Sequence, residues 1–133
     1  MKAKKCVLIV TDGCEETVKI AEKISAAIKG NEVTLKTAPE FRGNDILPVD
    51  AFFLGCEKPS PGSFAYLEDL LKHINLAGRP CGVFTPGNEK AAKYLAGLIK
   101  DSEAAVNPES IYSGSGAELK NWAKNTISGA FQS

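Results

Sequence analysis

The sequence has few of the residues on which metal and dithiol chemistry depend. It contains one histidine, His73, and four cysteines whose spacings include no C-x-x-C pair. Zinc knuckles and thioredoxin-type motifs need cysteines at that short spacing, so both are excluded. We therefore assign no metal ligand and expect no metal site.

Long apolar runs and an excess of charge are also lacking. No apolar run approaches the ~20 residues of a membrane-spanning helix. The first run, Cys6 to Val10, is too short for a signal-peptide core. The 16 Lys and Arg residues balance 16 Asp and Glu residues, so neither a nucleic-acid surface nor a polybasic membrane anchor is indicated. We expect a cytoplasmic protein, and the sequence leaves its oligomeric state open.

The composition is typical of a single soluble globular domain. The chain has 133 residues, of which 44% are apolar and 24% are charged. A chain of this length can bury roughly two thirds of the surface that its unfolded state exposes. It can therefore form a core without disulfide or metal crosslinks, and we predict one domain over residues 1–133.

Short apolar segments alternate with helical patterns along the chain. We predict strands at 5–10, 32–37, 50–55 and 81–85, and a weaker one within 104–112. The alternating pattern of 32–37 favours a position near the sheet edge. Helical stripes cover 20–28, 67–74 and 91–99, whereas 39–48 has room for at most a short helix. This alternation predicts an α/β fold in three α/β/α layers, with a five-stranded parallel sheet.

Specific residues are expected to end or begin these helices. Gly30-Asn31 should stop the first helix, and Gly78 should close the one over 67–74. Ser115-x-x-Glu118 is a capping box that should open a last helix. The apolar face of that helix carries Leu119, Trp122, Ala123, Ile127 and Ala130.

The predicted sheet directs attention to a few loops. In an open α/β sheet, ligands bind beyond the carboxyl ends of the strands, where the strand order reverses. The loops at 11–17, 55–63, 85–88 and 112–115 follow the predicted strands and are the candidates. They contain neither a Walker loop nor a G-x-G-x-x-G fingerprint. A phosphorylation receiver needs an Asp at the end of the third strand and a Lys after the fifth, and a small phosphatase needs a Cys followed six residues later by an Arg. Neither pattern is present.

Three segments carry a resemblance to a known family. They are Val7-Leu8-Ile9-Val10 with the loop that leads to Thr17, the run from Val49 to Cys56, and Trp122-Ala123 in the last helix. The chain resembles short-chain flavodoxins over essentially its full length, and the resemblance is strongest in these segments. Val83-Phe84-Thr85-Pro86-Gly87 looks like the strand ending of compact flavodoxin-domain variants. The resemblance implies the strand order 2-1-3-4-5, FMN at the carboxyl ends of strands 1, 3 and 4, and electron transfer to a partner protein.

The same resemblance implies a set of cofactor-binding residues. In the phosphate loop Thr17 matches the last hydroxyl of the family motif, whereas Glu15 and Glu16 stand where flavodoxins have Gly-Asn. Carboxylates at a helix start compete with a phosphate for its positive field. No catalytic residue is implied, so we expect an electron carrier rather than a stand-alone enzyme. The implied site residues are Thr11, Asp12, Gly13, Cys14, Thr17, Cys56, Thr85, Pro86, Gly87 and Asn88.

Two alternatives stay open from the residues alone. One is a flavodoxin-fold binding or interaction module that no longer binds FMN, with the acidic loop serving a protein partner or a cation. The other is a thiol-redox protein that uses Cys14 and Cys56, which follow adjacent strands. A helix start favours the Cys14 thiolate, although the acidic neighbours oppose it. Cys6 and Cys81 are expected to be buried at the opposite end of the sheet, and Phe64 to be a core residue.

Overall fold

Five parallel strands form the centre of the computed structural model, which describes residues 5–46, 48–112 and 116–129. They are β1 (Cys6–Thr11), β2 (Glu32–Thr37), β3 (Ala51–Gly55), β4 (Pro80–Phe84) and β5 (Ala105–Val106). The strand order is β2-β1-β3-β4-β5, and every neighbouring pair is parallel. This confirms the predicted order and places β2 at an edge.

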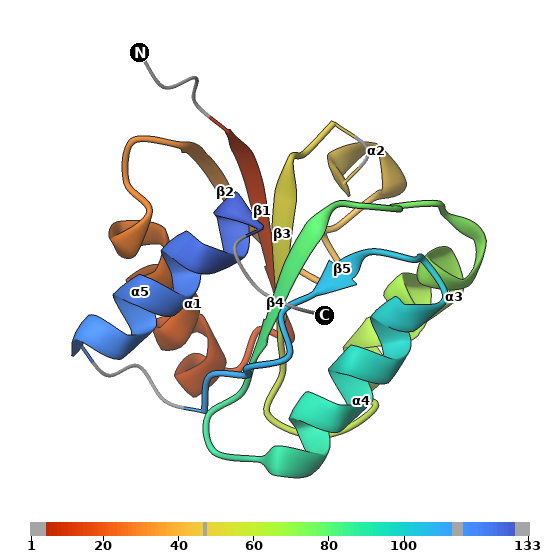
Figure 1. Ribbon diagram of the computed structural model, residues 1–133. Helices are drawn as coiled ribbons and strands as arrows, with labels where there is room; N and C mark the ends of the chain where they lie inside the picture. Colours follow the sequence, from red (N-terminus) through yellow and green to blue (C-terminus); the bar gives the residue numbers. More distant parts are fainter. Residues whose placement is uncertain (1–4, 47, 113–115, 130–133) are drawn as a thin grey trace.

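Helices cover both faces of this sheet, as the alternating pattern predicted (Figure 1). One face carries α1 (Glu15–Ala27) and α5 (Gly116–Ser128), and the other carries α3 (Ala65–His73) and α4 (Glu89–Lys100). The connection after β2 holds only a short helix, α2 (Gly43–Ile46), and a 3-10 turn, η1 (Gly62–Phe64), precedes α3. In the described residues no helix is long and apolar enough to cross a membrane.

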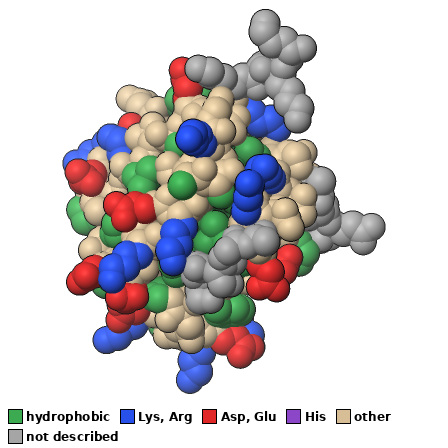
Figure 2. Space-filling model, turned by 90° about the vertical axis from the view of Figure 1, so that its left-hand side faces the viewer, with side chains coloured by type: hydrophobic (Ala, Val, Ile, Leu, Met, Phe, Trp, Pro, Cys, Tyr) green, Lys and Arg blue, Asp and Glu red, His purple; other side chains and the backbone are tan. Residues whose placement is uncertain are grey.

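Strand alternation divides the apolar core into two layers. Side chains of successive strand residues point to opposite faces, so Val7, Ile9 and Phe53 pack toward α1 and α5, while Leu8 and Leu54 pack toward α3 and α4. Every residue of β3 is buried, as expected for a strand covered on both faces. Figure 2 shows acidic and basic side chains interspersed on the face that α1 and α5 cover.

Helix α3 ends earlier than the sequence predicted. Gly78 has a φ of +80°, but the helix stops at His73, because Ile74 already has an extended backbone. The buried Leu76 explains the early end, since its N–H donates to the carbonyl of Ser102 at 2.7 Å and draws the chain toward α4. Gly78 therefore lies in the following turn rather than at the helix end.

Cys6 also departs from its prediction, whereas Cys81 is buried as expected. Cys6 opens β1 beside the edge strand β2, so one side of it stays open to solvent. Its Sγ donates to Glu32 Oε2 at 3.4 Å, and this hydrogen bond, together with partial burial, raises the pKa of the Cys6 thiol. Two other predictions, the Ser115 cap and the packing of Ala130, lie outside the described residues.

Candidate functional site

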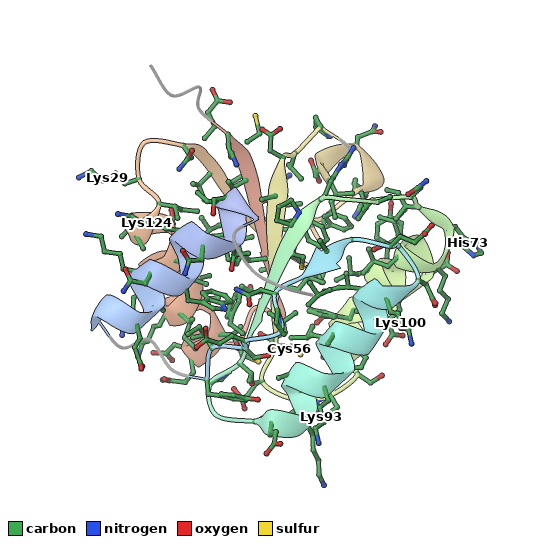
Figure 3. All side chains as sticks on the ribbon, viewed as in Figure 1. Lys29, Cys56, His73, Lys93, Lys100 and Lys124 are labelled. Carbon is green, nitrogen blue, oxygen red and sulfur yellow. The ribbon has the colours of Figure 1, made fainter. Side chains whose placement is uncertain are left out.

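The carboxyl ends of β1, β3 and β4 meet in one row at the lower edge of the sheet in Figure 1. Thr11 is the register partner of Gly55, and Gly55 is the partner of Phe84. The loops that continue from these residues therefore lie side by side. Figure 3 shows Cys56, which follows β3, at this edge. The sequence-predicted site residues of all three loops are thus brought to one place.

The backbone of Glu57 joins these three loops. Its N–H donates to Asp12 Oδ2 at 2.7 Å, and its carbonyl accepts from Asn88 Nδ2 at 3.1 Å. Asp12 Oδ1 also accepts from the N–H of Cys14 at 3.0 Å. The Asn88 Oδ1 accepts from the N–H groups of Lys90 and Ala91 and so caps α4. Asp12 and Asn88 lie where the sequence predicted, but both side chains hold loops together.

The acidic pair at the start of α1 points away from this row. Glu15 and Glu16 are strongly exposed, with 82% and 62% of their side chains accessible, and their carboxylates lie 3.5 and 3.4 Å from Lys19 Nζ. Lys19 lies one turn further along the helix on its exposed surface. The two carboxylates therefore lie on the solvent-exposed side of α1. Glu15 and Glu16 should therefore compete with a bound phosphate less than their places in the sequence suggest.

Two buried hydroxyls at this edge lack hydrogen-bond partners. Thr17 lies in the first turn of α1 and Thr85 directly follows β4, and both side chains are fully buried. Neither Oγ1 has a partner among the described residues. A buried hydroxyl without a hydrogen bond costs about 1–3 kcal/mol. Such groups in a native fold call for an explanation, and a bound ligand is one.

The first turn of α1 is also uncapped by any side chain. Cys14 is the N-cap residue, and its side chain makes no capping hydrogen bond. Thr11 Oγ1 accepts from the N–H of Gly13 at 3.2 Å, in a turn that Gly13 makes with a φ of +84°. The loop is thus fixed by its own side chains, while the amino end of the helix keeps its positive field.

A cavity of about 580 Å³ lies between the loop after β3 and the loop after β4. This volume is within the range of small-molecule sites. Pro86, Gly87 and Asn88 were predicted, but the lysines were not assigned to the site. Lys93 pairs with Glu89 at 3.7 Å and points outward from α4 in Figure 3. The lining residues are Glu57, Lys58, Pro86, Gly87, Asn88, Glu89, Lys90 and Lys93.

Aromatic side chains do not line this cavity in the described part of the chain. Phe64 is fully buried in the core, as predicted, with its ring centroid 6.4 Å from that of Tyr94. Tyr94 donates its hydroxyl to Glu68 Oε2 at 2.5 Å. Burial and this hydrogen bond raise the pKa of Tyr94, so its hydroxyl stays protonated. Both rings thus belong to the wall between α3 and α4.

Two free thiols complete the site. Cys14 is half-buried, and Cys56 is fully buried. Burial raises the pKa of the Cys14 thiol, and the nearby Asp12 raises it further, against a smaller lowering by Lys58. Burial, Asp12 and Cys14 raise the pKa of Cys56 to about 12. Burial and the acidic neighbours therefore disfavour the Cys14 thiolate. The described residues contain no group of three His, Cys, Asp or Glu side chains that could hold a metal.

No family model and no curated protein matches the sequence, but solved structures do. A short-chain flavodoxin associated with a non-canonical PDU bacterial microcompartment has a TM-score of 0.82 at 14% identity, over 96% of this chain and 99% of that chain. A flavodoxin of Streptococcus pneumoniae has a TM-score of 0.79 at 16% identity, over 94% and 98%. A flavodoxin variant of Fusobacterium nucleatum bound to flavin mononucleotide has a TM-score of 0.72 at 11% identity, over 97% and 98%.

Proposed function

We propose that this chain, which has a flavodoxin-like fold, is an electron carrier that binds FMN or a related flavin at the carboxyl ends of β1, β3 and β4. The observation that carries the proposal is the pair of buried hydroxyls without partners, Thr17 and Thr85, at the edge where this fold binds ligands. A bound flavin supplies the one- or two-electron redox chemistry, and the protein positions it.

The amino end of α1 fits the phosphate of such a nucleotide. Thr17 offers a buried hydroxyl, and the first turn of the helix offers a positive field without a side-chain cap. Glu15 and Glu16 are drawn outward by Lys19. The carboxylate of Asp12 lies beside this helix start, and its charge is already shared between the amides of Cys14 and Glu57.

The cavity between the loops after β3 and β4 fits a flavin ring by volume, but its walls carry lysine, glutamate and asparagine side chains and a proline, and no aromatic ring among the described residues. An aromatic partner would add about 0.5–1.5 kcal/mol to ring binding beyond area burial. We therefore expect a weaker complex than one with stacked aromatics on both faces. Lys58 and Lys90 at this cavity would offset the negative charge of the nucleotide.

A carrier also needs a partner to which it passes electrons. The rim of the cavity carries Lys58 and Lys90, for which no ion pair is found within the described residues. We propose that a redox partner protein docks over this rim.

The test is a titration of the purified protein with FMN, followed by absorbance and by calorimetry. We expect binding at micromolar concentrations, and weaker binding of riboflavin because it lacks the phosphate. Thr17→Val should weaken FMN binding but leave riboflavin binding unchanged. Thr126→Val is the matched control, because Thr126 is equally buried in α5 and has two hydrogen bonds of its own. Absence of binding at tens of micromolar FMN would refute the carrier function and leave the interaction module.

A further inference from the structure

The topology brings two of the four cysteines together. Cys14 lies three residues after Thr11 and Cys56 one residue after Gly55, and Thr11 and Gly55 are register partners on adjacent parallel strands. Both cysteines therefore lie at the same end of the sheet, just after two adjacent strands. Cys6 and Cys81 lie near the opposite, amino ends of β1 and β4.

One carboxylate holds the two cysteine segments against each other. The Asp12 oxygens accept from the N–H of Cys14 at 3.0 Å and from the N–H of Glu57 at 2.7 Å. Glu57 directly follows Cys56 in the chain. Since both amides bind the two oxygens of a single carboxyl group, the backbones that carry the two thiols are fixed close together.

Cys14 also acts electrostatically on Cys56. Cys14 is among the groups that raise the pKa of Cys56, and Asp12 acts on both thiols. Their accessibility differs, because Cys14 is half-buried and Cys56 is fully buried. An external reagent therefore reaches Cys14 first.

We propose that Cys14 and Cys56 are a reversible thiol pair that closes to a disulfide and so ties the loop after β1 to the loop after β3. The oxidant is a low-molecular-weight disulfide such as oxidised glutathione. The Cys14 thiolate attacks one glutathione sulfur, which forms a mixed disulfide and releases one glutathione thiolate. The Cys56 thiolate then attacks Sγ of Cys14 and releases the second. The protein loses two electrons and two protons, and the glutathione disulfide is reduced to two thiols.

The crosslink would join the loop after β1 to the loop after β3, and the loop after β3 is one wall of the cavity. The crosslink does not depend on a bound flavin, because the loops, the cysteines and Asp12 belong to the chain itself. The proposed carrier function and the thiol pair can therefore each fail without the other.

The experiment treats the folded, flavin-free protein with oxidised glutathione and follows free thiols and intact mass. Wild type should lose two thiols and gain no glutathione, and trypsin should then yield Cys14 and Cys56 in one linked product. Cys6 shares the tryptic segment between Lys5 and Lys19 with Cys14, so the digest is repeated in Cys6→Ser. Cys6→Ser should behave as wild type does.

Single variants of the pair separate its two steps. Cys56→Ser should stop at the mixed disulfide and keep one glutathione on Cys14, whereas Cys14→Ser should stay unmodified. Wild type that also keeps glutathione on Cys14 would show that Cys56 does not reach it. Wild type whose thiols react only in urea would show that the fold keeps them apart. Either of these two results overturns the proposal.

Discussion

The carboxylate of Asp12 and the backbone N–H of Glu57 are joined by a 2.7 Å hydrogen bond that crosses from the loop after β1 to the loop after β3. Asp12 also binds the N–H of Cys14, so one side chain satisfies amides in both loops. A half-buried carboxylate in this position sets the geometry of the loops and the electrostatics of the thiols between them.

Replacing Asp12 by Ala should therefore destabilise the protein and activate both thiols. Loss of two hydrogen bonds to a charged acceptor should cost about 2–4 kcal/mol in the free energy of unfolding. Because Asp12 raises the pKa of Cys14 and of Cys56, its removal should lower both values and speed alkylation at a fixed pH. Urea denaturation and iodoacetamide kinetics measure the two effects. Unchanged alkylation rates across pH would contradict the role of Asp12.

Thr17 and Thr126 should respond in opposite ways to replacement by Val. Thr17 Oγ1 is buried without a partner, so its removal should stabilise the flavin-free protein by about 1 kcal/mol. Thr126 Oγ1 donates to the carbonyl of Trp122 and accepts from Asn107, so Thr126→Val should destabilise by about 1–3 kcal/mol. Denaturant unfolding of both variants without flavin gives the sign of each change. A loss of stability in Thr17→Val would mean that its hydroxyl is satisfied in solution.

Gly55 leaves room for the ring of Phe84. A Cβ at position 55 would overlap the Phe84 ring, which is buried between the sheet and the α1/α5 layer. Gly55→Ala should therefore destabilise by about 1–3 kcal/mol through overpacking. Combining it with Phe84→Leu should cost less than the sum of the two single changes. Thermal or denaturant unfolding of the three variants measures the coupling, and strict additivity would show that the two sites do not touch.

Burial of Cys56 should make stability depend on pH in the alkaline range. Its folded pKa is raised from 9.0 to about 12, so the folded state holds the thiol proton more tightly than the unfolded state does. The stabilising contribution is complete below pH 9.0 and is lost as pH rises toward about 12. Other groups titrate in this range as well, so the difference between wild type and Cys56→Ala isolates the thiol. Parallel stability curves for the two proteins would contradict the shift.

The sheet could be predicted from the sequence because β1 and β3 are nearly continuous apolar runs, which suit strands buried on both faces. The edge position of β2 followed from its alternating pattern in the same way. The end of α3 could not be predicted, because a long-range hydrogen bond from Leu76 to Ser102 decides it. Gly78 gave the stronger local signal and misplaced the helix end.

The sequence predicted which loops meet at the candidate site, but not what their side chains contact. The rule that ligands bind at the carboxyl ends of parallel strands identified the candidate loops, and Pro86, Gly87 and Asn88 from these loops line the cavity. The direction of the Glu15 and Glu16 side chains depends on Lys19, and the use of Asp12 as a link between loops depends on the register of β1 and β3. Neither contact can be predicted from the residues of one loop alone, because each depends on a residue outside that loop.

Asn88 caps α4 with its side-chain oxygen and holds the Glu57 carbonyl with its side-chain nitrogen. Because the N–H of Glu57 binds Asp12, hydrogen bonds connect the loop after β1 to the loop after β3, and that loop to the loop after β4. Parting the loops after β3 and β4 would break the Asn88–Glu57 bond, and moving the loop after β3 away from β1 would break the Asp12 bond as well. A guest molecule should therefore enter the cavity without parting these loops, and the cavity should keep one shape with and without it.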